Sequence, residues 1–253
     1  MTESQVYLSP VSVRMLRLEL TRVLALLVLV GESTGRARPG QETCQVGEGV
    51  AVGQMDDKDM EEASGLAYSR RQSAILWTIN DHGGPNTAIA LGEDGKKVAD
   101  ATLKDIKNVD FEDIASTVID GVPMILVSDT GNNDHDRESL SILRFMEPDV
   151  SSGHNVDISR NDIEDLQVRY EGFSYDCEAL AVDESSGDLF MFTKDRENSI
   201  SEVYRYPFPQ TEDNNPFTLG RWTSLEYVDE YQSALRARGH TPPLLDHRGR
   251  HLP

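Results

Sequence analysis

One twenty-residue pattern occurs three times in this chain, and the copies align without gaps. They are residues 62–81 (EASGLAYSRRQSAILWTIND), 110–129 (DFEDIASTVIDGVPMILVSD) and 176–195 (DCEALAVDESSGDLFMFTKD). Each copy opens with an acidic residue and closes with an aspartate, and the same column holds Ala67, Ala115 and Ala181. A unit that recurs in this way indicates a repeat architecture, in which neighbouring units bury one another's hydrophobic faces.

Each copy predicts two short apolar strands separated by a polar turn, and two further strands follow it. The predicted first strands are 65–69, 113–117 and 179–183, and the second strands are 74–79, 124–128 and 189–193. The predicted third strands are 87–92, 140–145 and 202–207, and the fourth strands are 98–103, 166–172 and 223–228. Four short antiparallel strands per repeat are typical of a β-propeller blade. A β-sandwich is the alternative, but it does not explain why one motif recurs three times.

We therefore expect an all-β propeller with its repeats at about 62–109, 110–173 and 174–230, together spanning 62–230. Propellers typically have four to eight blades, so three repeats predict an incomplete portion of a six-bladed ring. Residues 38–61 are expected to form a linker with one strand, in EGVAVGQM, that would complete the last blade. Residues 231–253 are basic and rich in proline, glycine and histidine, which indicates an irregular tail.

The N-terminal 37 residues have the pattern of a leader. Arg14, Arg17 and Arg22 precede an unbroken apolar run, Val23–Val30, and small residues follow it. This order predicts a signal peptide and a secreted protein, with an apolar run too short to span a bilayer stably. An uncleaved signal anchor that tethers the protein to a membrane is the alternative.

The charge of the chain limits its partners. Lysine and arginine number 24 against 44 aspartates and glutamates, which gives a formal net charge of −20. Such a surface repels nucleic-acid phosphates and anionic lipids. We therefore expect a small molecule or another protein as the partner, and no nucleic acid.

The two cysteines, Cys44 and Cys177, are able to pair in an oxidising compartment. The alternative is a buried structural thiol at Cys177, whose column is otherwise apolar, and a separate thiol in the N-terminal segment.

The acidic residues fall in columns of the repeat. If the copies are blades, three rings gather around one axis: Glu62, Asp110 and Asp176, then Ser64, Glu112 and Glu178, then Asp81, Asp129 and Asp195. Converging carboxylates repel one another unless a cation compensates them, and Ca²⁺ suits oxygen ligands in an extracellular protein. The predicted metal ligands are Asp81, Glu112, Asp129, Glu178 and Asp195. Alternatively, these aspartates cap turns within each blade.

Two histidines are candidates for proton transfer. His82 follows Asp81, and His135 lies in the stretch VSDTGNNDHD, residues 127–136. Each is a candidate general base, although a loop histidine is commonly just solvated. The stretch itself lacks the glycine and the closing glutamate of an EF-hand loop, so it indicates a polar connection after a strand.

The stretches VDFEDIAS, ILVSDTGNN and YDCEALAVDESSGDLFMFTKD resemble a group of uncharacterised secreted bacterial propeller-like proteins with WEDIA, GDIGDN and DAEAL stretches in similar order. The likeness covers residues 62–209. More loosely, the chain is similar to the six-bladed gluconolactonases, paraoxonases and β-propeller phytases. The chain departs from the group by having SDTGNND in place of GDIGDN and by lacking the later blades. The resemblance implies a propeller fold and secretion, and it carries over no catalytic residue.

Two functions follow as hypotheses. The first is a secreted propeller that binds a ligand or partner and holds a structural Ca²⁺. The second is a Ca²⁺-dependent hydrolase of ester or phosphoester bonds, with Asp81, Glu112 and Asp129 on the metal and His82 or His135 moving protons. The repeats contain no basic cluster that would hold a phosphate, which counts against the second hypothesis.

Overall fold

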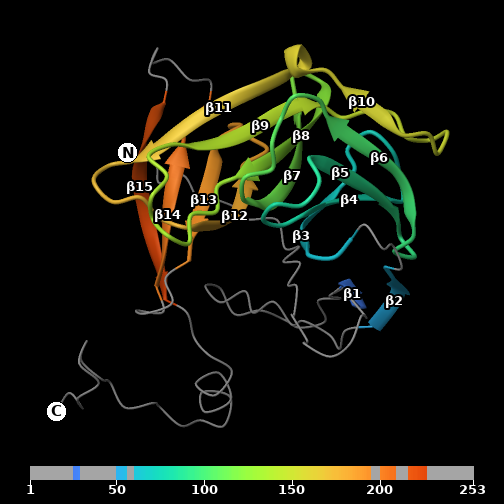
Figure 1. The fold of residues 1–253 in the computed structure, drawn as a ribbon, viewed down its shortest axis with the longest axis horizontal. Helices are drawn as coiled ribbons and strands as arrows, with labels where there is room; N and C mark the ends of the chain where they lie inside the picture. The colour runs from blue at the N-terminus through green and yellow to red at the C-terminus, as the bar shows by residue number, and fades with distance from the viewer. Residues whose placement is uncertain (1–24, 29–49, 56–59, 195–199, 209–215, 227–253) are drawn as a thin grey trace, which may run out of the picture.

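The structure is a computed structural model that describes residues 25–28, 50–55, 60–194, 200–208 and 216–226. These residues are all-β, as the sequence predicts, and Figure 1 shows their strands. One short 3-10 turn, η1 (Arg160–Asp162), is the single helical segment in this part of the chain.

The strands of each repeat form a four-stranded antiparallel meander. The first meander consists of β3 (Ala63–Tyr68), β4 (Ile75–Asn80), β5 (Thr87–Gly92) and β6 (Lys97–Leu103). The second consists of β7 (Phe111–Ile119), β8 (Val122–Asp129), β9 (Leu140–Met146) and β11 (Ile163–Tyr170). The third consists of β12 (Cys177–Val182), β13 (Leu189–Thr193), β14 (Ile200–Tyr206) and β15 (Phe217–Glu226).

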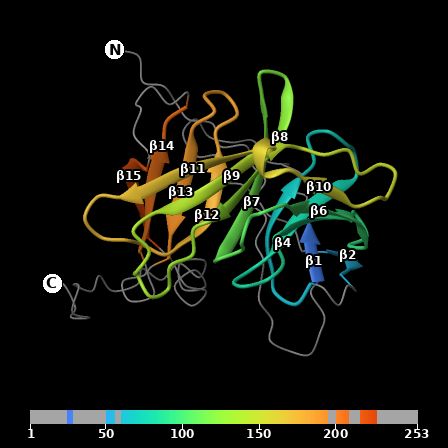
Figure 2. The same ribbon diagram turned by 45° about the horizontal axis from the view of Figure 1, so that its top comes forward.

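Neighbouring meanders are linked at their outer strands. The short strand β10 (Val156–Ile158) lies parallel to the last three residues of β6, and the start of β15 lies parallel to the last three residues of β11. The second link joins two meanders into one eight-stranded sheet, whose strands extend from the left side of Figure 2, at β15, to its centre, at β7. Its end strands, β7 and β12, contact each other, so this sheet has a nearly closed outline.

Local sequence explains the tight turns. Asp120 and Gly121 connect β7 to β8, and both have positive φ angles, 50° and 79°. This is the backbone of a type I′ turn, whose twist matches that of the flanking strands and for which Asp-Gly is a favoured pair.

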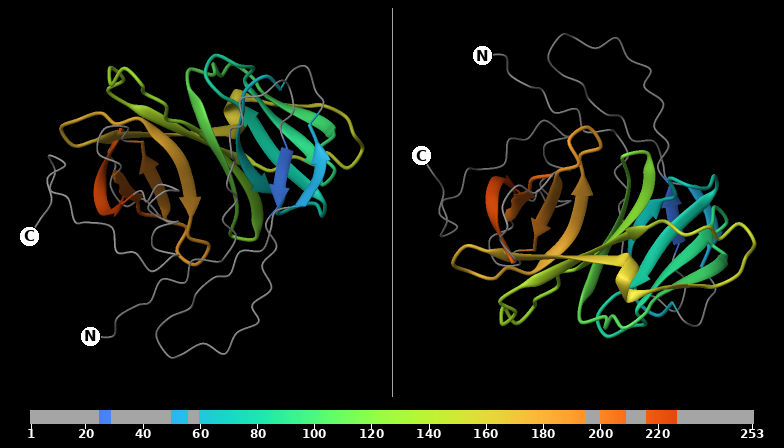
Figure 3. Two further views of the ribbon diagram at one scale, coloured as in Figure 1. Left: turned by 90° about the horizontal axis from the view of Figure 1, so that it is seen from below. Right: turned by 90° about the horizontal axis from the view of Figure 1, so that it is seen from above.

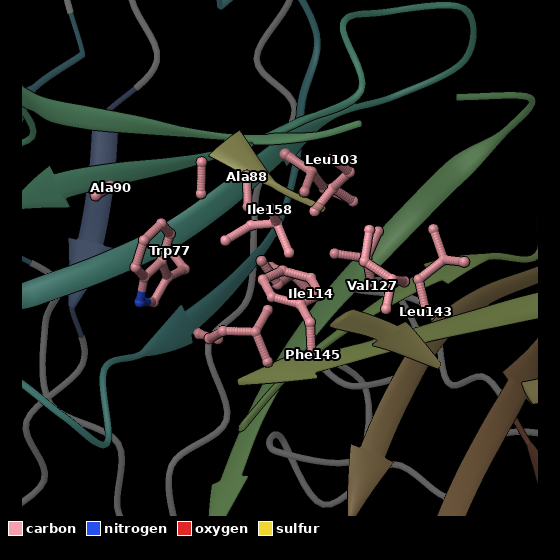
Figure 4. Packing of buried hydrophobic residues seen from close by; sticks show 14 of the residues in the cluster. Trp77, Ala88, Ala90, Leu103, Ile114, Val127, Leu143, Phe145 and Ile158 are labelled. Atoms are coloured by element: carbon pink, nitrogen blue, oxygen red, sulfur yellow. The ribbon is translucent and has the colours of Figure 1, made fainter. Parts of the chain in front are cut away.

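Two hydrophobic clusters hold the meanders together. The first lies between the first and second meanders and contains Trp77 of β4, Val127 of β8 and Phe145 of β9 (Figure 4). The second lies between the second and third meanders and contains Leu126. Successive residues of β8 therefore face opposite neighbours, because side chains alternate along a strand.

The first strands of the three meanders meet in the middle of the structure. β3 contacts β7, and β7 contacts β12, whereas the fourth strands lie toward the periphery (Figure 3). Equivalent positions of neighbouring repeats are thus brought close together, as the acidic columns of the sequence require.

The segment before the first meander contributes a separate pair of strands. β2 (Val50–Gln54) confirms a strand in EGVAVGQM, but it pairs with β1 (Ala25–Val28) rather than with the third meander. β1 falls within the apolar run of the predicted leader. The structure does not test whether this segment is a signal peptide, so the leader stays a prediction. The rest of the leader and the tail, 231–253, lie outside the described residues.

Candidate metal centre

Five carboxylates gather where the first strands begin. Asp110 and Asp176 immediately precede β7 and β12, Glu112 and Glu178 are the second residues of these strands, and Asp81 follows β4. They form two groups that share Glu112: Asp81 with Asp110 and Glu112, and Glu112 with Asp176 and Glu178. Within each group, the potential ligand oxygens all lie within 4.8 Å of one another. This spacing is compatible with a cation between them.

The backbone around the centre fixes these side chains. The backbone N–H of Asn132 donates to Asp176 Oδ1 at 2.8 Å, and the N–H of Gly131 donates to the carbonyl of Asp110 at 3.1 Å. Asn108 holds the loop after β4 from the other side, because its amide nitrogen donates to the carbonyl of Asp81 at 2.9 Å. The centre is therefore built from the loops that follow β4 and β8 and from the starts of β7 and β12.

Glu112 lies in the middle of the centre and is only 5% exposed. Its carboxylate has no hydrogen-bond donor and no basic partner among the residues that the structure describes. Burial, followed by the nearby carboxylates, raises the pKa of Glu112 to about 9. Burial also raises the pKa values of Asp110 and Glu178. A cation between these groups would remove the repulsion that disfavours their charged forms.

Two basic side chains lie at the rim of the centre. His82 Nδ1 is 3.0 Å from Asp110 Oδ1, and the histidine side chain is 75% exposed. Lys194 Nζ donates to Glu178 Oε1 and lies 3.9 Å from Asp176 Oδ2. His82 thus contacts the first group through Asp110, and Lys194 contacts the second group through Glu178 and Asp176. Neither contacts Glu112, the carboxylate that the two groups share.

The stretch 127–136 forms the end of β8 and the loop behind the acidic centre. A Cβ atom on Gly131 would lie 2.3 Å from Asp110 Oδ2 and 2.4 Å from Glu112 Oε1, so only glycine fits against these carboxylates. The first strand of the third meander, β12, is tied to the same loop, because Thr130 Oγ1 donates to the Cys177 carbonyl at 2.9 Å. The polar connection expected here therefore also positions the centre.

Of the predicted metal ligands, Asp81, Glu112 and Glu178 belong to the two groups, and Asp129 does not. Asp129 is instead paired with Arg137 at 2.9 Å and accepts a hydrogen bond from the Asp110 N–H at 3.1 Å. It thus has the turn-capping role that was the alternative for this column. Asp195 lies outside the described residues.

Asp81 and Asp129 of the third column do not lie at one level, because the second strands differ in register. The first residues of β3, β7 and β12 pair with Asn80, Asp129 and Thr193, respectively. Asp129 is thus at this level, whereas Asp81 is one residue beyond it. Asp110 and Asp176, which were placed in the first acidic column but not among the metal ligands, take the missing places.

The second candidate histidine is not part of the centre. His135 Nδ1 is 2.8 Å from the carbonyl of Ser174, and its ring lies 4.8 Å from that of Phe173. It has a positive φ of 56°, as expected of a turn residue. These contacts give His135 a role in holding the loop.

Cys177 carries a free, fully buried thiol in the structure. Burial raises the pKa of this thiol to about 12, which disfavours the reactive thiolate. The residue therefore matches the structural thiol that was the alternative to a disulfide. Cys44 lies outside the described residues.

A groove of about 540 Å³ extends from the acidic centre along the three first strands. Glu112 and Glu178 line one end, and Arg70 and Glu184, which form an ion pair, line the other. The repeated alanines lie between these ends: Ala67, Ala115 and Ala181. Small side chains in this column leave room for the groove, and its volume is in the range of small-molecule sites, about 300–1,000 Å³.

No helix in the described part of the chain is long and apolar enough to cross a membrane. Comparison of the sequence with models of known protein families gives no match, and comparison with curated proteins gives none either.

Proposed function

We propose that this chain is a secreted ligand-binding protein of the β-propeller type, in which the acidic centre holds a divalent cation at the end of the groove. The observation that carries the proposal is Glu112, a buried carboxylate with four other carboxylates around it and no basic partner among the described residues. A buried charge of this kind is costly unless it is neutralised by a proton or paired with a cation.

The arrangement of the meanders supports the propeller. Three four-stranded units pack face to face, each buries one face on the next, and their first strands lie together. These are the relations of consecutive propeller blades. The three-residue contact between β11 and β15 then links two blades at the periphery rather than closing a barrel.

Calcium is the cation that fits the centre best. All the potential ligands in both groups are carboxylate oxygens, and no cysteine or histidine belongs to either group within the described residues. Hard cations prefer such ligands, and Ca²⁺ tolerates the irregular geometry that side chains from several loops provide. The ion would be held by Glu112 with its neighbours and would supply positive charge beside the groove.

Thermal unfolding of the full chain with calcium and with chelator tests the cation. Binding to the folded form alone stabilises it by about 2.7 kcal/mol at a calcium concentration 100 times the dissociation constant, so the melting temperature should rise by several degrees. Glu112→Gln should abolish this rise. Glu171→Gln, at an exposed carboxylate that belongs to neither group, should retain it. A wild-type melting temperature indifferent to calcium would refute the proposed ion.

The hydrolase remains a second candidate because of one contact. His82 is exposed to solvent and lies next to Asp110, which orients its ring at the edge of the centre. A histidine held in this way can accept a proton from a water molecule. The bound cation would polarise a substrate carbonyl or phosphoryl oxygen.

Hydrolysis of p-nitrophenyl acetate and p-nitrophenyl phosphate separates the two functions. A hydrolase should show calcium-dependent turnover of one substrate, and His82→Gln should lower it at least 100-fold without changing the calcium-induced rise in melting temperature. If turnover is absent, or if it survives both His82→Gln and chelation, the binding function stands and the hydrolytic mechanism does not.

A further inference from the structure

Lys194 is placed beside one of the two carboxylate groups by its own backbone. It directly follows β13, and its N–H donates to the carbonyl of Asp176 at 2.9 Å. Its ammonium group then reaches Glu178 Oε1 and approaches Asp176 Oδ2 to 3.9 Å. The positive charge is therefore tethered to the group formed by Glu112, Asp176 and Glu178.

The other group has no comparable charge among the described residues. Its rim residue is His82, whose side chain is largely in solvent, whereas the Lys194 side chain is only 30% exposed. No lysine or arginine side chain among the described residues reaches the group formed by Asp81, Asp110 and Glu112, so this is the group without a tethered ammonium or guanidinium.

We propose that Lys194 is an internal cation that occupies the second group, so that the chain binds one divalent ion, in the group of Asp81, Asp110 and Glu112. This inference rests on the proposed cation-binding function and adds the position and number of the ions. Calcium lies 2.3–2.6 Å from its ligand oxygens. An ion on Asp176 and Glu178 would therefore lie next to the ammonium group, and the two positive charges would repel each other.

The tether makes Lys194 an effective competitor for the second ion. A group held next to its binding site has an effective concentration in the millimolar range, and it need not be captured from solution. Glu112 belongs to both groups and has two carboxylate oxygens, so without the ammonium group it can serve one ion in each group.

Isothermal titration of calcium into the full chain counts the ions. We expect one ion per wild-type chain, two per Lys194→Met chain, and one per Lys194→Arg chain, because arginine keeps the positive charge. Lys104→Met removes an exposed lysine that is paired with Asp157, and it should leave one ion. Two ions in the wild type, or one in Lys194→Met, would overturn the inference.

Asp81→Asn locates the ion. In the wild-type background it should abolish high-affinity calcium binding, and in the Lys194→Met background it should reduce two ions to one. Circular dichroism tests whether the Lys194→Met chain folds. If it does not fold, Asp81→Asn alone decides. If this single variant still binds one calcium ion, the ion does not lie in the group of Asp81, Asp110 and Glu112, and the inference is wrong. Failure of the proposed function itself looks different, because then neither the wild type nor any variant binds calcium.

Discussion

At the scale of single residues, Glu112 sets the behaviour of the centre. Its pKa is raised to about 9 because the folded protein buries its carboxylate among other acids. In the unfolded chain, the carboxylate returns to its ordinary pKa of 4.5. Between these two values, the folded form binds a proton that the unfolded form has lost, so stability falls as the pH rises. Above pH 9, the Glu112 carboxylate is ionised in the folded form too, and in the absence of a cation its negative charge is not neutralised.

We therefore predict that, in chelator, the free energy of unfolding declines between about pH 5 and pH 9. Each unit of pKa difference corresponds to about 1.4 kcal/mol, so the wild type should lose more than about 1 kcal/mol over this range. Glu112→Gln removes the titrating group and should flatten the decline. Urea unfolding at several pH values measures this, and equal slopes in the wild type and Glu112→Gln would show that Glu112 is not the titrating group.

Gly131 makes a second prediction at this scale. A methyl group at this position would overlap the carboxylates of Asp110 and Glu112, at 2.3 and 2.4 Å. Gly131→Ala must therefore displace potential ligands, and we expect calcium affinity to fall at least tenfold in titration calorimetry. Gly220→Ala is the matched control, because a Cβ atom there meets nothing within 4 Å. Unchanged affinity in Gly131→Ala would mean that the ion does not use these two carboxylates.

At the scale of elements, side-chain-to-backbone hydrogen bonds align the first strands. Ser64 Oγ of β3 donates to the carbonyl of Glu112 on β7 at 2.6 Å, and the Leu180 N–H of β12 donates to Asp113 Oδ2 at 2.7 Å. Asp113 also packs against Gly65 of β3, where an added Cβ atom would lie 2.5 Å from Asp113 Oδ1. One carboxylate of β7 thus contacts both neighbouring first strands.

Asp113→Ala should destabilise the protein by about 1–3 kcal/mol, because it leaves the Leu180 N–H without its acceptor. Asp113→Asn keeps an acceptor oxygen and should cost less. Chemical denaturation of both variants measures the difference. If the alanine variant is as stable as the asparagine variant, the contact between β7 and β12 does not depend on this hydrogen bond.

The strands were largely predictable from sequence because their signals are local. The predicted strands 87–92 and 189–193 coincide with β5 and β13. β10 was missed, because three residues carry no pattern and this strand depends on its partner β6. The repeat columns placed Glu112 and Glu178 in one ring, and these two residues do share a group, but they assigned Asp81 to a different ring from Glu112. They gave no information on the register shifts or on Arg137, which takes Asp129 out of the centre.

At the scale of the whole molecule, the second meander is shared by both hydrophobic clusters. It packs on the first meander through residues such as Val127 and on the third through residues such as Leu126. The acidic centre also draws carboxylates from all three repeats. Loss of any one meander would expose a face of its neighbour, so the described core should unfold as one cooperative unit.

The two tryptophans allow a test of this cooperativity. Trp77 is fully buried in the first meander, and Trp222 is 52% exposed in the third. Trp222→Phe leaves a reporter of the first meander, and Trp77→Phe leaves one of the third. In each variant, we expect the fluorescence transition in urea to coincide with the loss of strand circular dichroism. We also expect calcium to shift the two signals together, because the ion stabilises the folded unit as a whole. Separate midpoints within one variant would mean that the meanders fold independently.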